Sequence, residues 1–351
     1  MVKKLTAVFF IVIFLFISAS ASTLDDVIKA LKKGEVEKAY YLQKNLSQEE
    51  KKLLEILLLL HQDKLTDAEL LSGNYIPCNV LYLPDGIDAL VVNKVIEKLY
   101  VIKEKSGVPV IVAEFDCVTG KKPGDKLKEG DQRTPEGIYI PLYWRGHLPK
   151  IYGPGAFVLN YPNLIDRKIL RRGGHGIWIH GMDTPSRPPH STNGCIVLEN
   201  KDLKRLRKFI TPKETPVIIV DELCKEPFKN FVSERNSLVD FVYKWKAAWE
   251  NSPEDLQTYF SFYSKNFVTD KYSFNEWKKY KKRVTAGKKW IKIKISNLAI
   301  TRDGRLLSFG RLYLISFDMK YRSNNYNWQG HKLLYVTKEG EKWKILGEES
   351  F

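Results

Sequence analysis

A cysteine and a histidine, fifteen positions apart, are the residues of this chain best suited to covalent chemistry. His180 closes one apolar run, and Cys195 opens the next after a loop rich in proline and serine. A thiol attacks as its thiolate, and a neighbouring histidine can take the proton. We therefore predict that two strand ends place Cys195 and His180 side by side. Gly181 and Gly194, one beside each, would let a substrate carbonyl approach the backbone closely.

Other interpretations of these residues compete with catalysis. Cys195 could be buried or disulfide-bonded, and His180 could be a core histidine at a strand end. A zinc site would need His175, His180, His190 and Cys195 to converge. Their spacings fit no zinc-finger or zincin pattern, so we predict no metal and no other cofactor. His190 is then expected to be a loop residue.

Four ordered segments resemble one known family. IHG at 179–181 and STNGCIVL at 191–198 resemble the histidine-glycine and Ser/Thr-x-Gly-Cys motifs of the L,D-transpeptidase catalytic domain, which acts on peptidoglycan stem peptides. DQRTPEGIY at 131–139 resembles its Thr-Pro-x-Gly strand entry, and GPGAFVLNYPN at 153–163 its substrate-side segment. Together these matches are specific, whereas any one alone would be weak.

The resemblance implies acyl transfer through a thioester. His180 takes the proton from Cys195, and the carbonyl of Gly181 orients the imidazole. The thiolate attacks the carbonyl at the L-centre of the diamino acid that precedes a terminal D-alanine, and D-alanine leaves. We expect the backbone N–H groups of Gly194 and Cys195 to stabilise the oxyanion.

The acyl acceptor decides the product. Transfer to an amine of a neighbouring stem gives an L,D cross-link, which is the transpeptidase activity of the family. Transfer to water trims a tetrapeptide to a tripeptide, which is an L,D-carboxypeptidase activity. A third hypothesis is a non-catalytic peptidoglycan-binding envelope protein, because Val197 stands where many family members carry arginine. Arg187 is the nearest substitute that the sequence offers.

Seven residues around the motif are predicted to bind substrate. Trp178 lies two positions before His180 on the same strand face, where it would wall the cleft unless it belongs to the core. Arg187 could bind a stem-peptide carboxylate through its planar guanidinium, or it could face solvent. His175 could line the cleft or solvate a turn. The predicted set is Gly194, Asn193, Thr192, Ser191, Arg187, Trp178 and His175.

The first 21 residues predict export. Two lysines precede an apolar stretch and a small-residue ending at Ala19–Ala21, which is typical of a secretory signal peptide. An uncleaved N-terminal anchor is the alternative. We therefore predict that the mature protein works in the periplasm or cell envelope, without a nucleic-acid partner.

The C-terminal third is strongly basic within a chain of formal net charge +16. From Cys224 onward there are 25 Lys and Arg against 14 Asp and Glu. Such a surface suits anionic envelope polymers or anionic lipid headgroups. A solvated face that keeps the protein soluble would carry the same charge.

Hydrophobic periodicity divides the mature chain into three parts. Residues 22–75 have helical spacing, which predicts either a docking or homodimerisation module or a cap on the catalytic domain. Residues 78–223 contain short strands broken by Gly, Pro and Asp, as in a β-sandwich or barrel. Strands are predicted over 80–83, 89–93, 98–103, 109–115, 138–142 and 215–220, with a helix over 199–209.

Residues 228–351 combine helices with strands and resemble the nuclear transport factor 2-like (NTF2-like) fold. Helices are predicted over 231–249, 255–263 and 274–284, and strands over 290–300, 306–316, 331–337 and 343–346. The fold class is thus multidomain α+β, with a helical N-terminal module, a mainly-β L,D-transpeptidase sandwich and an α+β, cone-like C-terminal domain. This three-part architecture resembles the cell-shape-determining L,D-carboxypeptidases of curved and helical bacteria.

Four cysteines in an oxidising compartment allow two disulfides. A nucleophilic Cys195 must stay reduced, which leaves Cys78, Cys117 and Cys224 with one odd member. Cys78 and Cys224 bracket the proposed catalytic domain, so a bond between them is a hypothesis from position alone.

Overall fold

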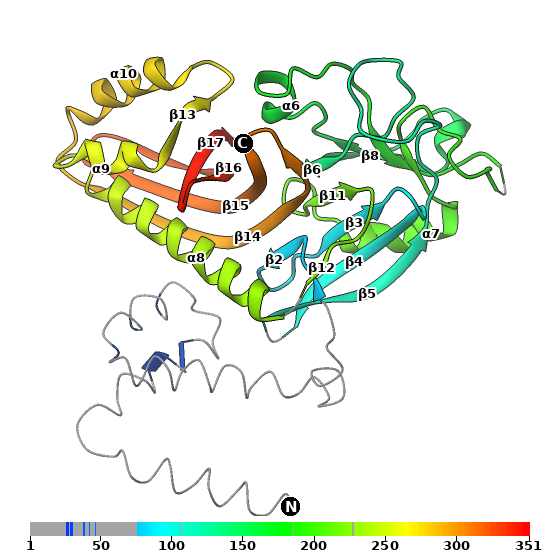
Figure 1. Ribbon diagram of the computed structural model, residues 1–351, viewed down its shortest axis with the longest axis horizontal. Coiled ribbons are helices and arrows are strands. Elements are labelled where there is room, and N and C mark those ends of the chain that lie inside the picture. The colour runs from blue at the N-terminus through cyan, green and yellow to red at the C-terminus, as the bar shows by residue number, and fades with distance from the viewer. Residues whose placement is uncertain are drawn as a thin grey trace, which may run out of the picture. The chain divides into compact units, whose positions relative to one another are not determined.

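The computed structural model describes residues 76–351, except 106, 185 and 227, together with isolated positions between 26 and 46. Apart from those positions, the predicted signal peptide (1–21) and helical module (22–75) lie outside the described residues and stay predictions. The described residues from 76 onward belong to one compact unit, coloured from cyan to red in Figure 1. No helix in this part is long and apolar enough to cross a bilayer.

The larger sheet of the strand-rich region has the order β5, β4, β3, β11 and β6. Its strands β3 (Ala89–Asn93) and β11 (Val217–Val220) pair in parallel. Both are continuous apolar runs that are buried along their whole length, as expected for strands covered on both faces. The other strands are β4 (Lys98–Lys105), β5 (Val108–Asp116) and β6 (Gly137–Tyr139).

A smaller sheet of four strands has the order β10, β9, β8 and β7. Apolar side chains of both sheets form one core, to which the helix α7 (Asn200–Leu206) adds two leucines. Two sheets around a shared core agree with the predicted sandwich. The strands and the remaining short helix are β7 (Pro141–Arg145), β8 (Ala156–Leu159), β9 (Trp178–His180), β10 (Ile196–Val197) and α6 (Leu164–Lys168).

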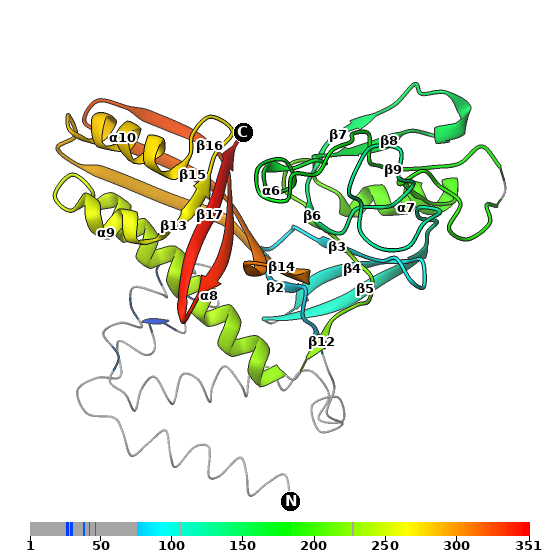
Figure 2. The same ribbon diagram turned by 45° about the horizontal axis from the view of Figure 1, so that its top comes forward.

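In the C-terminal region three helices pack on a sheet of order β13, β17, β16, β15, β14 and β2. The long helix α8 runs beside β14 (Figure 1), and Figure 2 shows α9 and α10 next to the same sheet. Fully buried aromatic residues, among them Trp245, Tyr259 and Trp277, fill the space between. The elements are α8 (Phe228–Glu250), α9 (Leu256–Ser261), α10 (Phe274–Thr285), β13 (Tyr263–Val268), β14 (Ile291–Leu307), β15 (Gly310–Ser323), β16 (Asn327–Glu339) and β17 (Lys342–Ser350).

The structure differs from several predicted elements. The strand predicted over 138–142 is divided between β6 and β7, which belong to different sheets, and the strand predicted over 306–316 spans the turn between β14 and β15. The helix predicted over 255–263 ends at Ser261, and β13 begins at Tyr263 because this residue pairs with Ile345 of β17. The residues of β13 show no clear alternation of buried and exposed side chains. They are extended because they pair with a distant strand. Local sequence therefore gave no signal for β13.

The strand predicted over 80–83 belongs to the C-terminal sheet and not to the catalytic domain. β2 (Val80–Tyr82) pairs antiparallel with β14, where Tyr82 lies opposite Ile300. Apolar residues from both regions also form a common buried cluster. The regions 78–223 and 228–351 thus share a strand and a core, whereas the sequence pattern suggested independent units.

A disulfide joins Cys78 to Cys224, which confirms the pair hypothesised from position. The Cys78 N–H donates to the Cys224 carbonyl at 3.1 Å, and the Cys224 N–H donates to Asn79 Oδ1 at 3.2 Å. Cys117 and Cys195 are free thiols, and Cys117 is buried. The bond therefore holds the two ends of the strand-rich region together and leaves Cys195 reduced.

We expect the double variant Cys78→Ser/Cys224→Ser to lose about 2–5 kcal/mol of unfolding free energy, because the bond closes a loop with a sequence separation of 146 residues. Urea unfolding followed by tryptophan fluorescence measures this difference. Reduced wild type should match the double variant. Equal midpoints for oxidised and reduced wild type would contradict a stabilising bond.

Candidate active site

The pairing of two short strands puts Cys195 and His180 on one side of the smaller sheet. β9 and β10 run parallel, with Ile179 opposite Ile196 and His180 opposite Val197. Ile179 and Ile196 belong to the apolar core, so alternation turns His180 and Cys195 to the other face. Their Cα atoms are separated by two residues along the strand and one strand spacing, roughly 8 Å. A thiol and an imidazole that point toward each other can bridge that separation.

A turn held by Thr192 presents the nucleophile. Thr192 Oγ1 donates to the Cys195 carbonyl at 2.8 Å and accepts the Gly194 N–H at 3.1 Å. Gly194 has a φ of 126°, and a Cβ there would lie 2.7 Å from the Arg133 carbonyl oxygen. Only glycine fits this position.

Two residues that were predicted to act on substrate make hydrogen bonds within this turn. Thr192, predicted to bind substrate, uses its hydroxyl to position Cys195. The Gly194 N–H, predicted as an oxyanion donor, is already donated to that hydroxyl. The Cys195 N–H is the predicted donor that remains.

The backbone after His180 orients its imidazole. Nδ1 lies 2.6 Å from the Gly181 carbonyl oxygen. A carbonyl only accepts, so Nδ1 carries the proton and Nε2 is the basic nitrogen. Gly181 is packed closely, because a Cβ there would lie 2.3 Å from Asn200 Oδ1. Its N–H donates to the Tyr152 carbonyl at 3.1 Å, which fixes the segment that holds the imidazole.

Burial keeps the imidazole neutral at physiological pH. It lowers the pKa of His180 to about 4, and the positive charge of Arg187 lowers this pKa further, while the hydrogen bond with Gly181 raises it. A neutral imidazole is the form that can accept a proton from a thiol.

Burial acts on the thiol in the opposite direction. It raises the pKa of Cys195, while a backbone hydrogen bond from Trp178 and the charge of Lys126 lower it. The thiol donates to the Gly176 carbonyl at 3.4 Å. The resting pair is therefore a neutral thiol and a neutral imidazole.

Two predicted substrate-binding residues lie beside His180. The Trp178 ring is half-buried and packs 5.0 Å from the Tyr152 ring, which lies 5.0 Å from the His180 ring. Arg187 hydrogen-bonds Asp183 at 3.2 Å, and its buried Nε has no partner among the described residues. Trp178 thus packs on the ring that contacts the imidazole, and its role at a cleft wall stays a prediction, while Arg187 keeps a donor without a partner among the described residues.

The other predicted residues differ in their surroundings. The Ser191 hydroxyl is buried and has no hydrogen-bond partner in the described part of the chain. Asn193 is exposed, and its Oδ1 accepts from Lys121 Nζ at 3.2 Å. His175 faces solvent 3.5 Å from Glu129, which favours the turn over the cleft. His190 lies in a loop, as expected, and its N–H donates to a glutamate.

Sequence reasoning missed Lys126 and Tyr152. Lys126 belongs to the segment GKKPGDK, whose charges are typical of a solvated turn, yet its side chain is 3% exposed. Tyr152 directly precedes the predicted substrate-side segment 153–163. The charge beside Cys195 is thus Lys126, while Arg187, proposed as the substitute for the absent arginine, acts on His180.

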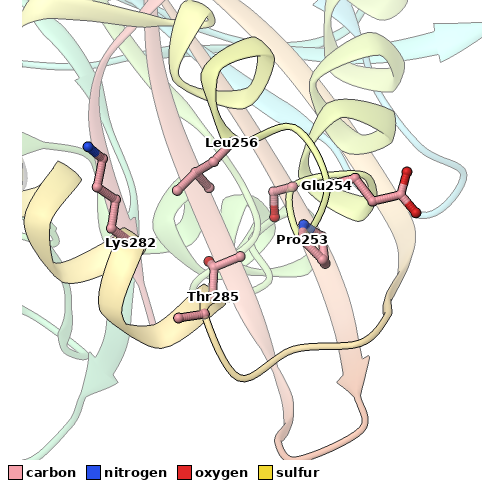
Figure 3. A pocket seen from close by; sticks show the side chains of 7 residues that line it. Pro253, Glu254, Leu256, Lys282 and Thr285 are labelled. Atoms are coloured by element: carbon pink, nitrogen blue, oxygen red, sulfur yellow. The ribbon is translucent and has the colours of Figure 1, made fainter.

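A cavity of about 200 Å³ lies between the turn that follows α8 and the end of α10. Figure 3 shows Leu256 and Thr285 pointing toward each other across it, while the charged ends of Glu254 and Lys282 point away. Its lining contains no cysteine or histidine. This cavity is therefore unrelated to the chemistry of Cys195.

Two family models match the chain in separate regions. The L,D-transpeptidase catalytic domain matches residues 88–219, and the Cds6 C-terminal NTF2-like domain matches residues 237–349. The first match contains the site described above. The second contains α9, α10, β13 to β16 and most of α8 and β17, but not β2. Comparison with curated proteins finds no match.

Solved structures match across both regions. The helical cell shape determining protein Pgp2 from Campylobacter jejuni is 32% identical with a TM-score of 0.64, and the match covers 82% of this chain and 100% of that one. A mutant of Pgp2 is 33% identical with the same TM-score, over 82% and 98% of the two chains. Bd1075 from Bdellovibrio bacteriovorus is 28% identical with a TM-score of 0.66, over 79% and 98%. The chain therefore belongs to the Pgp2 family, which joins an L,D-transpeptidase catalytic domain to an NTF2-like C-terminal domain.

Proposed function

We propose that the chain is an exported cysteine enzyme that releases D-alanine from peptidoglycan stem tetrapeptides through a thioester on Cys195. The observation that carries this proposal is the register of β9 and β10, which puts Cys195 and His180 on one face. The imidazole on this face is neutral and presents Nε2, because Nδ1 is held by the Gly181 carbonyl. A scaffold that only bound peptidoglycan would need none of this arrangement.

In the first half-reaction the Cys195 proton passes to His180 Nε2 as Sγ attacks the carbonyl of the diamino acid. The Cys195 N–H donates to the oxyanion that forms. The tetrahedral intermediate then breaks its C–N bond, and the imidazolium gives its proton to the departing amine of D-alanine. The acyl group remains on Sγ as a thioester.

In the second half-reaction we propose water as the acceptor. His180 takes a proton from water, the hydroxyl attacks the thioester, and Sγ leaves with a proton returned by His180. The product is a tripeptide. The support is the similarity to Pgp2, a helical cell shape determining protein, across both regions, together with the resemblance of this architecture to cell-shape-determining L,D-carboxypeptidases. We accordingly propose a role in cell shape.

Transfer to an amine is the second candidate reaction. It is favoured by the catalytic domain alone, whose family is named for transpeptidation and matches residues 88–219. The nucleophile, base and oxyanion donor are the same for both acceptors.

The basic C-terminal region, with its surplus of Lys and Arg, is proposed to hold the protein near anionic envelope polymers. Homodimerisation through residues 22–75 also stays a proposal.

We expect Cys195→Ala to abolish turnover of purified disaccharide-tetrapeptide, because no other group can form the thioester. Mass spectrometry of the products tests this result. Tripeptide from wild type alone supports the hydrolase, and dimers joined through two diamino acids support the transpeptidase. The matched control is Cys117→Ala, which removes the other free thiol and should leave turnover near the wild-type level. Full turnover by Cys195→Ala would rule out the thioester route.

We expect kcat/KM to fall on acidification only near pH 4, because the pKa of His180 is lowered to about 4 and its basic form persists above that value. A histidine of ordinary pKa would already lose activity near pH 6.5. The rate profile of D-alanine release between pH 3.5 and 8 measures the acid limb.

Arg187→Met serves as the companion variant for this profile. Removal of the guanidinium that lowers the pKa of His180 should move the acid limb to higher pH. An acid limb near pH 6.5 in wild type would contradict a depressed His180 pKa.

A further inference from the structure

The thiolate of Cys195 needs a positive charge, and the position that supplies one in many family members is occupied by Val197. Val197 is completely buried and lies opposite His180 in the strand pair. Its side chain is uncharged, so this position supplies no cation to the thiol. The cation must therefore come from another element. Burial of the thiol makes the requirement stronger, because an isolated charge in such a place is costly.

Lys126 is a buried lysine that packs against the backbone segment whose Gly176 carbonyl accepts a hydrogen bond from the thiol. Its Cε lies 3.2 Å from where a Cβ of Gly174 would stand. Two residues further along, the Gly176 carbonyl accepts the hydrogen bond of Cys195 Sγ. The Lys126 side chain is 3% exposed, and its Nζ lies 2.6 Å from Asp131. A lysine is seldom buried to this degree unless it is paired.

Asp131 anchors Lys126 through an ion pair, and the turn around it fixes its carboxylate. The Asp131 carboxylate also accepts backbone N–H groups from Leu127, Lys128 and Arg133. Burial raises the pKa of Asp131, but the hydrogen bond from Lys126 and these three backbone donors together lower it to about 2. The field of Lys126 at Cys195 is correspondingly favourable to the thiolate.

The residue before Lys126 is held by the C-terminal region. Arg305 of β14 contacts Asp125 at 2.8 Å through Nη1, and it contacts Asp303 at 2.6 Å through Nη2. Arg172 forms a further ion pair with Asp125. The Asp125 carboxylate also accepts the N–H of Glu136 at 2.9 Å, which ties it to the Thr-Pro-x-Gly segment.

Arg305 also explains a glycine of that segment. Gly137 has a φ of 135°, and a Cβ there would lie 2.7 Å from Arg305 Nη2. The guanidinium therefore lies directly over the strand entry of the catalytic domain. Its side chain is 11% exposed, so the contact excludes most solvent.

We propose that Lys126 is a positioning residue that stabilises the thiolate of Cys195, and that Arg305 of the C-terminal region holds Lys126 in place through Asp125. The C-terminal region is then part of the active-site machinery as well as a neighbouring domain. The inference rests on the proposed function only in taking Cys195 as the nucleophile.

The test measures thiol ionisation without any substrate, so its failure is separate from failure of the proposed reaction. Full-length protein is treated with iodoacetamide between pH 5 and 10. The thiolate displaces iodide and forms a C–S bond, and mass spectrometry quantifies the peptide that contains Cys195. We expect Lys126→Met to shift the profile upward by about half to one pH unit, which is the lower range for one nearby charge. Lys126→Arg should restore the wild-type profile.

Lys128→Met is the matched control, because Lys128 is an exposed lysine on the same turn and should leave the profile unchanged. A Lys126→Met profile that coincides with wild type would overturn the role of Lys126. An equal shift in Lys128→Met would also overturn it, because the effect would then be one of general charge.

Arg305→Met tests the contribution of the C-terminal region. We expect a shift in the same direction as Lys126→Met, and Lys294→Met, an exposed lysine on the same strand, should cause none. Arg305→Lys keeps a charge for Asp125 and Asp303 and guards against a folding defect, which a thermal scan of each variant detects. A wild-type profile for folded Arg305→Met would overturn the coupling to the C-terminal region.

Discussion

The parallel register of β9 and β10 is the constraint on which the active site depends. Side chains alternate along a strand, so a slip of one residue would turn Cys195 into the core and Ile196 toward solvent. Ile179 and Ile196 resist such a slip because both are completely buried. The apolar core thus fixes the geometry of the polar pair. Thr192 then sets the turn that precedes the strand, and it does so with one hydroxyl that both donates and accepts.

Desolvation gives this site a defined resting state. It disfavours charge on both reactive groups, so it lowers the pKa of His180 and raises the pKa of Cys195. Oxidants react with the thiolate and not with the thiol, so a neutral pair protects the sulfur from oxidation between turnovers. In the proposed mechanism the proton moves only when attack begins, and the fixed charge of Lys126 and the Cys195 N–H then favour the anionic sulfur and the anionic oxygen.

Local pattern predicted the elements well wherever burial alone decides conformation. The apolar runs that became β3 and β11 and the motif around Cys195 and His180 were all placed from sequence, and Cys78 and Cys224 were paired from position. The errors concern contacts between distant segments. β13 is extended only because of β17, and β2 joins a sheet whose other strands lie beyond residue 260. Lys126 lies in a segment that reads as a solvated turn, because burial of its charge depends on Asp131 and on residues near 174.

The ion pairs of Arg305 favour a specific arrangement of the two regions more than they favour stability. Desolvation of buried charges offsets much of their attraction, so such networks contribute little net free energy, whereas loss of one partner is costly, about 3–5 kcal/mol. Asp303 pairs with Arg305 within β14, whereas Asp125 pairs with it only when β14 and the turn at 120–126 lie in one relative position. The shared strand β2 and the common apolar cluster supply attraction between the regions, and attraction of that kind tolerates small shifts. A bidentate guanidinium tolerates far less. The apolar contacts therefore hold the regions together, and Arg305 selects the position in which Lys126 lies beside the thiol.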